Sequence, residues 1–123
     1  MASVLIIDGD PDFCHGLTRI IQRMGHKAVS TGTMAQGLKA AHGEGVDIVF
    51  LNVSLPDGAG LALLPTINQL PSHPEVIIIT GARDPDGAEL AMTCGAWDYI
   101  EKGASTKHIA LAIKRAIEYR REH

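Results

Sequence analysis

Polar side chains that could do chemistry stand directly after short apolar runs of this sequence. The set consists of Asp8, Asp10, Asn52, Thr80 and Lys102. Clustered carboxylates without a glycine-rich phosphate loop suit a hard cation such as Mg²⁺. A lysine and a hydroxyl opposite them suit phosphoryl oxygens. A central carboxylate could then attack phosphorus as a nucleophile.

Asn52 stands where that chemistry would need its nucleophile. It ends the apolar part of the stretch "DIVFLNVSLPDG", residues 47–58. The lone pair of an amide nitrogen is delocalised, so this side chain cannot form an acyl phosphate. Its carbonyl oxygen could still contact a cation, but without a negative charge. The sequence therefore predicts a phosphate-chemistry site that lacks its central carboxylate.

The apolar runs predict the strands of a parallel sheet. Near-continuous Val, Ile and Leu runs, rather than alternating patterns, are typical of strands covered on both faces. The three strong runs and the two weaker ones are 4–7, 48–51, 76–79, 27–30 and 97–100.

Helical patterns separate these runs, and several have clear boundaries. Asp-Pro at 10–11 and again at 84–85 supplies an N-cap followed by a proline suited to the first turn. Gly25 and Gly95 are typical stops for these two helices. A last helix is predicted to begin near Ser105 and to run to about residue 121. Its expected buried residues are Ile109, Ala112, Ile113, Ala116 and Ile117.

Two weaker helices complete the alternation of strands and helices. One covers 34–42, and the other covers 60–70, where Pro65 should bend the helix or shift its start. The result is an α/β fold with (βα)5 order, a doubly wound parallel sheet between two layers of helices. Sites in such sheets lie at the carboxyl ends of the strands, which is where the polar set stands.

Composition narrows the functional classes further. The chain has 123 residues, enough for one domain, and a net charge of −3 that gives no reason to expect nucleic-acid binding. Cys14 and Cys94 have no metal-ligand spacing, and a reduced cytoplasmic protein is favoured over a disulfide-bonded one. The six histidines have no metal-ligand spacing either and are expected at the surface. No signal peptide and no membrane-spanning run are predicted.

Four stretches, in this order and at this spacing, resemble the receiver domains of bacterial two-component response regulators. They are "VLIIDGDPDF", "DIVFLNVSLPDGAGLALLP", "PEVIIITG" and "GAWDYIEKG". The resemblance covers essentially the whole chain. It is closest to the receivers of enhancer-binding transcriptional activators. It implies the flavodoxin-like strand order 2-1-3-4-5 and three layers.

The resemblance also implies roles for individual residues. The family would use Asp8 and its neighbour for Mg²⁺ and position 52 as the phosphorylated aspartate. Switch and phosphoryl-binding roles would fall on Thr80, Tyr99 and Lys102. The sequence departs from this pattern at three positions, which are Gly9 in place of the second acid, Asn52, and Gly103 in place of a proline.

These departures change what the resemblance implies. The usual phosphorylation should be unavailable at Asn52, and Mg²⁺ binding should be weak or absent. Asp10 could substitute as a ligand, but a helix cap is favoured for it. Lys102 is expected to form a structural ion pair with Asp8 rather than to bind phosphate. Without a proline at 103, the bond after Lys102 is expected to be trans.

Several readings of the function remain open. We favour a non-enzymatic regulatory and protein-interaction module of a signalling pathway, for which a histidine kinase or another signalling protein is a possible partner. A homodimer through residues 84–121 is possible, and the last helix could lead into an absent output domain. One alternative is a phosphorelay receiver that accepts phosphate on another residue, such as Ser54 or Asp57. Another is an engineered Asp-to-Asn form of an active receiver, although three departures around one pocket favour a natural degenerate one.

A flavodoxin-like cofactor binder is a weaker alternative. The sheet order would be the same, but "DGDPDF" after the first strand is acidic and would repel a phosphate group. Neither GxGxxG nor GxxxxGK[ST] occurs, so nucleotide-binding enzymes of those types gain no support.

Overall fold

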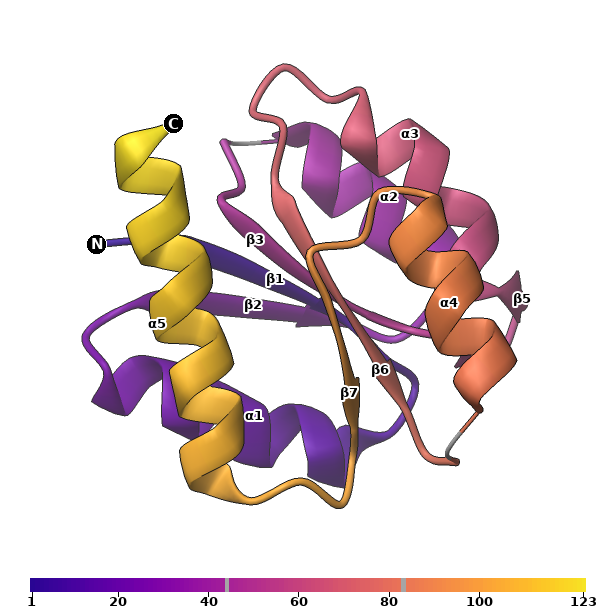
Figure 1. Cartoon of the computed structure of the whole chain (residues 1–123), viewed down its shortest axis with the longest axis horizontal. Helices are drawn as coiled ribbons and strands as arrows, with labels where there is room; N and C mark the ends of the chain where they lie inside the picture. Colours follow the sequence, from indigo (N-terminus) through magenta and orange to yellow (C-terminus); the bar gives the residue numbers. More distant parts are fainter. Residues whose placement is uncertain (44, 83) are drawn as a thin grey trace.

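Five parallel strands form the central sheet of the computed structural model, which describes residues 1–43, 45–82 and 84–123 (Figure 1). The strands are β1 (Ser3–Ile7), β2 (Lys27–Thr31), β3 (Ile48–Asn52), β6 (Glu75–Thr80) and β7 (Asp98–Glu101). Their order is β2-β1-β3-β6-β7, and every neighbouring pair is parallel. Counting only these five strands, the order is the expected 2-1-3-4-5. The doubly wound α/β prediction is confirmed.

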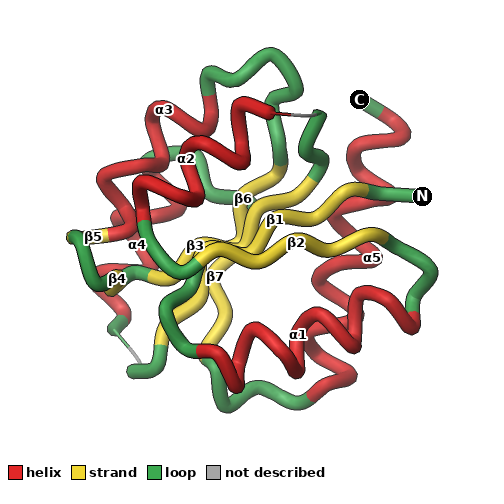
Figure 2. The backbone as a smooth tube through the Cα atoms, turned by 180° about the vertical axis from the view of Figure 1, so that it is seen from behind, coloured by secondary structure: helices red, strands yellow, loops and turns green. Residues whose placement is uncertain are grey.

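Helices cover both faces of the sheet and make three layers (Figure 2). They are α1 (Pro11–Arg23), α2 (Met34–Gly43), α3 (Leu64–Asn68), α4 (Pro85–Thr93) and α5 (Thr106–Glu122). The helices α1 and α5 pack on one face, where Phe50 and Ile77 are fully buried. The helices α2, α3 and α4 pack on the other, where Val49 and Ile78 are fully buried. All five residues of β3 are buried, which is why its sequence shows no polar alternation.

The local signals at helix ends are confirmed. Asp10 caps α1, and its Oδ1 accepts hydrogen bonds from two amides of the first turn. Gly25 and Gly95 follow α1 and α4 with φ of +86° and +99°, a conformation in which a side chain would be strained. Asp84 is the N-cap residue of α4, although its side chain makes no capping hydrogen bond. Ser105 Oγ accepts from the amide of His108 at 3.1 Å and caps α5.

The buried face of α5 is the predicted one. Its buried residues are Ile109, Ala112, Ile113, Ala116 and Ile117. They join the core cluster that also contains the buried residues of α1. Their spacing of three and four residues follows the helical period, so the sequence pattern was sufficient to identify them.

The segment after β3 differs from the prediction of one helix over 60–70. A two-stranded hairpin comes first, β4 (Ser54–Leu55) paired with β5 (Gly58–Ala59). A 3-10 turn η1 (Gly60–Leu63) follows, and α3 begins only at Leu64, which places Pro65 in its first turn. The predicted effect of the proline on the start is therefore confirmed, whereas the hairpin was not predicted.

The two cysteines and His26 differ in their exposure to solvent. Cys14 is buried and Cys94 is exposed, and both are free thiols. The expectation that all histidines lie at the surface is wrong for His26, which is half-buried, because its Nδ1 accepts a hydrogen bond from the amide of Ala2 at 3.0 Å. Within the described residues, no helix is both long enough and apolar enough to cross a bilayer.

Candidate functional site

Asp8 lies at the centre of the polar pocket at the carboxyl end of the sheet. It follows β1 directly and is only 2% exposed. Its Oδ1 accepts three hydrogen bonds, from the Asp10 amide at 2.9 Å, Asn52 Nδ2 at 3.0 Å and Lys102 Nζ at 3.1 Å. One carboxylate oxygen thus joins the ends of β1, β3 and β7. The expected gathering of the polar set is confirmed for these residues.

Lys102 forms the predicted ion pair with Asp8. Its Nζ lies 2.8 Å from Asp8 Oδ2 and 3.8 Å from Asp10 Oδ2. At 2.8 Å the ammonium is the counter-ion of Asp8 Oδ2, which has no hydrogen-bond donor among the described residues. The Phe13 ring lies under the ammonium, with Nζ 4.8 Å from the ring centroid. The Lys102 amide also donates to the Thr80 carbonyl at 2.8 Å, which fixes the start of the loop.

Asn52 presents its amide nitrogen, not its oxygen, to Asp8. Its side chain is 8% exposed, and its Oδ1 accepts a hydrogen bond from the Ser54 amide at 3.4 Å. Only a glycine fits beside its backbone, because a Cβ at Gly60 would lie 1.8 Å from the Asn52 carbonyl oxygen. The Gly60 amide donates to the Val53 carbonyl at 2.9 Å, so the hairpin folds back tightly onto the end of β3.

Gly9 and Asp10 have roles other than cation binding. A Cβ at Gly9 would lie 3.1 Å from Pro56 Cδ, which is tighter than ordinary contact, and 3.4 Å from the Gly32 carbonyl oxygen. The hairpin therefore packs against the space in which a second acid would begin. Asp10 caps α1 through Oδ1, as predicted, and half of its side chain is exposed. Every peptide bond among the described residues is trans, including the bond after Lys102, as expected without a proline at 103.

Asp57, in the turn between β4 and β5, binds the start of α2, which is distant from it in the sequence. Its two carboxylate oxygens accept hydrogen bonds from the amides of Met34 at 2.8 Å and Ala35 at 3.2 Å. The Met34 hydrogen bond is the main reason that the pKa of Asp57 is lowered from its ordinary value. A cap contributed by a residue more than twenty positions away leaves no local sequence signal. Ser54, the other alternative acceptor, is exposed on β4.

Thr80 ends β6, and Tyr99 lies on the neighbouring strand β7. The buried Thr80 hydroxyl donates to the Ala82 carbonyl at 2.9 Å and accepts from the Ala82 amide at 3.3 Å. The hydroxyl is therefore bound to the loop that leads to α4. Tyr99 is half-buried and packs against the core cluster on the α2–α3–α4 face.

Cys14 is a core residue at the edge of the pocket. Its Sγ donates to the Asp8 carbonyl at 3.3 Å, and burial raises the pKa of the thiol. Asp8 adds to this effect, whereas Lys102 opposes it. The thiol is consequently protonated at neutral pH and helps to hold the backbone that carries Asp8.

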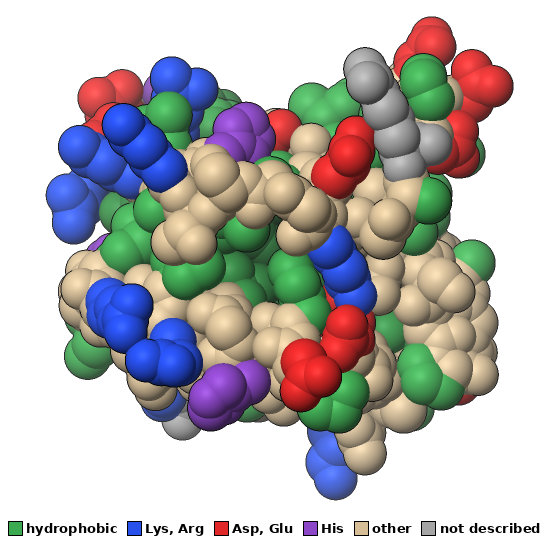
Figure 3. All heavy atoms as spheres, turned by 90° about the horizontal axis from the view of Figure 1, so that it is seen from below, with side chains coloured by type: hydrophobic (Ala, Val, Ile, Leu, Met, Phe, Trp, Pro, Cys, Tyr) green, Lys and Arg blue, Asp and Glu red, His purple; other side chains and the backbone are tan. Residues whose placement is uncertain are grey.

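Between α1 and α5 lies a shallow groove that starts beside Lys102. Figure 3 shows apolar side chains on its floor and Lys and Arg side chains near one end. Its lining includes Phe13, Ile20 and Ile109, together with Arg19 and Arg23. The pocket thus borders an amphipathic surface on the α1–α5 face of the sheet.

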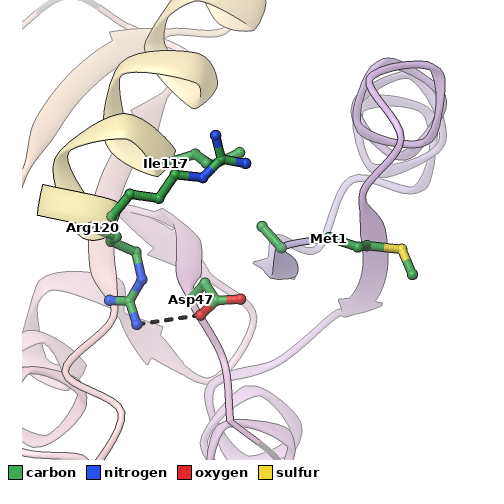
Figure 4. A pocket seen from close by; sticks show the side chains of 6 residues that line it. Met1, Asp47, Ile117 and Arg120 are labelled. Atoms are coloured by element: carbon green, nitrogen blue, oxygen red, sulfur yellow. Dashed lines mark hydrogen bonds and ion pairs between the residues drawn. The ribbon is translucent and has the colours of Figure 1, made fainter.

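A second polar cluster lies at the opposite end of the sheet. Arg120 on α5 donates to the carbonyls of His73 at 2.8 Å and Ser72 at 3.1 Å. It also lies 3.3 Å from Asp47 and 3.6 Å from Glu75. Figure 4 shows the Arg120–Asp47 contact at one wall of a small cavity that Met1 and Ile117 also line. Burial raises the pKa of Glu75, and Arg120 opposes that shift.

The pocket is a poor fit for the divalent cation that its position in the fold implies. Asp8 Oδ1 is already the acceptor of three donors, and one of these donors is the Asn52 amide. Gly9 supplies no ligand, and Asp10 Oδ1 is committed to the cap of α1. Mg²⁺ requires oxygen ligands in near-octahedral geometry, which these residues do not provide. Among the described residues, no group of three or more His, Cys, Asp and Glu side chains is arranged to hold a metal ion.

The strand order and the position of the pocket define a flavodoxin-like α/β protein with a site at the topological switch point. Within that class, the response regulator receiver domain matches residues 4–114, and the chain belongs to this family. The family assignment confirms the resemblance deduced from the four sequence stretches.

The relatives are mostly transcriptional regulators. The chain is 35% identical to the DNA-binding transcriptional regulator NtrC of Proteus hauseri over 98% of its own length, but it spans only 25% of that protein. It also resembles the structure of the beryllofluoride-activated NtrC4 receiver domain dimer, with a TM-score of 0.91 and 28% identity over 97% of this chain and 98% of that one. NtrX from Brucella abortus is similar at 29% identity and a TM-score of 0.90, over 99% of this chain and 29% of NtrX. The chain is thus close to the receivers of NtrC-type activators.

Proposed function

We propose that this receiver domain is a regulatory protein-interaction module whose state is not set by aspartyl phosphorylation. The observation that carries the proposal is the buried hydrogen bond from Asn52 Nδ2 to Asp8 Oδ1. In the family pattern, position 52 would hold the phosphorylated aspartate. An amide at this position has no nucleophilic oxygen to form the acyl phosphate, and here it instead satisfies the neighbouring carboxylate.

Control by a partner is the alternative to control by phosphate. Thr80 and Tyr99 persist at the positions of the family's switch residues, and the Thr80 hydroxyl bonds to the loop before α4. A partner that prefers one arrangement of this loop would shift the population by its difference in affinity for the two states. A histidine kinase would act on this chain by binding rather than by phosphoryl transfer, and we place the interaction in the cytoplasm.

The proposed output surface is the face formed by α4, β7 and α5, residues 84–121. Its exposed apolar side chains are Leu90, Met92, Leu111 and Tyr119. Their exposed fractions lie between 39% and 55%, so each offers apolar area for a partner to bury. We propose that this face forms a homodimer or binds a signalling protein. The relative with 28% identity forms a receiver domain dimer.

Intact-mass measurement after incubation with acetyl phosphate and Mg²⁺ tests the proposal. Three proteins are compared: the native chain, Asn52→Asp, and the double variant Asn52→Asp, Gly9→Asp. We expect no phosphoryl mass on the native chain and a gain of one phosphoryl group on the double variant. Because Pro56 restricts the space at Gly9, folding of the double variant is checked by circular dichroism.

Stoichiometric phosphorylation of the native chain would disprove the proposal. Peptide mapping would then locate the acceptor, beginning with Ser54, Asp57 and Asp10. A phosphate that resists hydroxylamine would point to Ser54, whereas a labile one would point to one of the two carboxylates. Failure of all three proteins to react, with the variants folded, would show that a carboxylate at position 52 is not sufficient to restore reactivity.

A further inference from the structure

We infer that the ammonium of Lys102 is the built-in cation of this pocket, and that the chain does not bind Mg²⁺ at Asp8. The inference rests on the proposed function only in taking this pocket as the equivalent of the family's phosphorylation site. It goes further because it states that the Lys102 ammonium takes the position that a metal ion would occupy. It also predicts that the pocket keeps its structure whether or not Mg²⁺ is present.

The position of the ammonium supports this assignment. Lys102 Nζ lies 2.8 Å from Asp8 Oδ2 and 3.1 Å from Asp8 Oδ1, so it faces both oxygens of one carboxylate. A cation that bound both oxygens of Asp8 would therefore compete with this ammonium. The Phe13 ring, 4.8 Å from Nζ, adds attraction for a positive charge at this position. The Lys102 side chain is 20% exposed, so water screens this pair only in part.

The hydrogen bonds of Asn52 support it independently. Asn52 Nδ2 donates to Asp8 Oδ1, and Asn52 Oδ1 accepts from the Ser54 amide. Turning the amide over would point its oxygen at a carboxylate oxygen and would leave the Ser54 amide facing an N–H group. An Asn52 ligand for Mg²⁺ would therefore break two hydrogen bonds in a pocket where the side chain is 8% exposed.

The remaining ligands of an ordinary cation site are absent or occupied. Gly9 has no side chain, and Pro56 lies against the space that one would need. Asp10 Oδ1 accepts from two amides of α1, while its Oδ2 is 3.8 Å from the ammonium of Lys102. The one ammonium offsets the buried charge of Asp8, so of the two carboxylates only the half-exposed Asp10 leaves a net negative charge to attract a divalent ion.

The test is a titration of the native chain with MgCl₂, followed by amide NMR of the residues at the pocket. We expect no saturable shift of the Asp10 and Asn52 amides up to about 10 mM Mg²⁺, a concentration above that needed to fill even weak protein sites. Saturable shifts at these amides in the native chain would overturn the inference. No substitution is needed for this arm, so it does not depend on a variant that folds.

A second arm asks whether Lys102 is the competing cation. The Asn52→Asp variant restores a carboxylate and is compared with the doubles Asn52→Asp, Lys102→Met and Asn52→Asp, Lys107→Met. Lys107 is an exposed lysine in the first turn of α5, so its replacement is the matched control. We expect the Lys102 change to tighten Mg²⁺ binding at least tenfold and the Lys107 change to leave it unaltered. Equal affinities in the two doubles would overturn the assignment of Lys102.

The outcomes separate this inference from the proposed function. A native chain that binds Mg²⁺ but gains no phosphoryl mass would overturn only the inference. A native chain that becomes phosphorylated would overturn the proposed function, whatever the titration shows.

Discussion

Replacing Asn52 with aspartate would put a second carboxylate against Asp8. Asn52 Nδ2 is now a donor 3.0 Å from Asp8 Oδ1 in a buried part of the pocket. The substitution changes this donor into an acceptor at almost constant volume. It removes one hydrogen bond and adds a repulsion between like charges. Its effect on the free energy of unfolding therefore tests the hydrogen bond between Asn52 and Asp8.

The magnitude follows from the distance. Two unit charges 3.0 Å apart repel by about 5–6 kcal/mol at an effective dielectric constant of about 20. Rotation of the new side chain and attraction to Lys102 offset part of this, while loss of the hydrogen bond adds about 1 kcal/mol. We expect Asn52→Asp to lower the free energy of unfolding by about 2–4 kcal/mol at neutral pH without Mg²⁺.

Urea unfolding monitored by the fluorescence of Trp97 is the assay. This is the only tryptophan in the chain, and it packs against Tyr119 with ring centroids 4.6 Å apart. Repulsion from Asp8 raises the pKa of the introduced carboxyl above its value in the unfolded chain. The destabilisation is therefore full above the raised pKa and disappears as pH falls through about 4, where the carboxyl is protonated in both states.

The matched control is Asn68→Asp, the same change at the other asparagine of the chain. Asn68 is half-buried, but the hydrogen bond from its Nδ2 to the Cys94 carbonyl, 3.1 Å long, is exposed to solvent, so we expect a loss of no more than about 1 kcal/mol. If Asn52→Asp costs no more than the control, or if its cost does not shrink at low pH, the amide does not stabilise Asp8 as argued.

Four further predictions concern other parts of the chain. Gly60→Ala should lower the free energy of unfolding by about 3 kcal/mol or more, because its Cβ would lie 1.8 Å from a backbone oxygen. Gly16→Ala in α1 should raise it by about 0.5–1 kcal/mol, since nothing lies within 4 Å. Burial and the N-terminal charge lower the pKa of His26. The free energy of unfolding should therefore fall as pH drops below about 6.5. His26→Gln should reduce this pH dependence, measured by urea unfolding. Asp57→Ala should increase hydrogen exchange in the first turn of α2, and the native protection should be lost as pH falls below about 4, through the lowered pKa of Asp57.

Each of these predictions has an outcome that would contradict it. Equal effects of the two glycine changes would mean that the turn after Asn52 is loose. An unchanged pH slope in His26→Gln would assign the acid sensitivity to other groups. Unaltered exchange at α2 in Asp57→Ala would show that the hairpin does not cap that helix in solution.

The parts of the fold that the sequence predicts well are those with local causes. The Asp10 cap and the glycine at position 25 are read from adjacent residues, and both define the ends of α1. The carboxyl-end placement of Asp8, Asn52 and Lys102 follows from parallel topology and needs no knowledge of side-chain contacts.

The unpredicted parts have partners that are distant in the sequence. The capping of α2 by Asp57 spans 23 residues, and the hydrogen bond from Ala2 to His26 spans 24. The orientation of the Asn52 amide depends on Ser54 and on a carboxylate 44 residues away. Periodicity and propensity describe each element alone, whereas these contacts exist only after the elements have packed.

The attachment of α5 at both ends has a consequence for the kinetics of recognition. Ser105 caps the start of the helix. Near its end, Arg120 donates to the His73 carbonyl and pairs with Asp47, the residue before β3. Leu111 and Tyr119, eight residues apart on this helix, therefore keep a separation of about 12 Å along its axis. The two side chains therefore already have their spacing before a partner binds. Binding then costs little conformational entropy for ordering this helix. We expect association at this face to be limited by diffusion and orientation, and loosening of Arg120 to slow it without removing any contact from the interface.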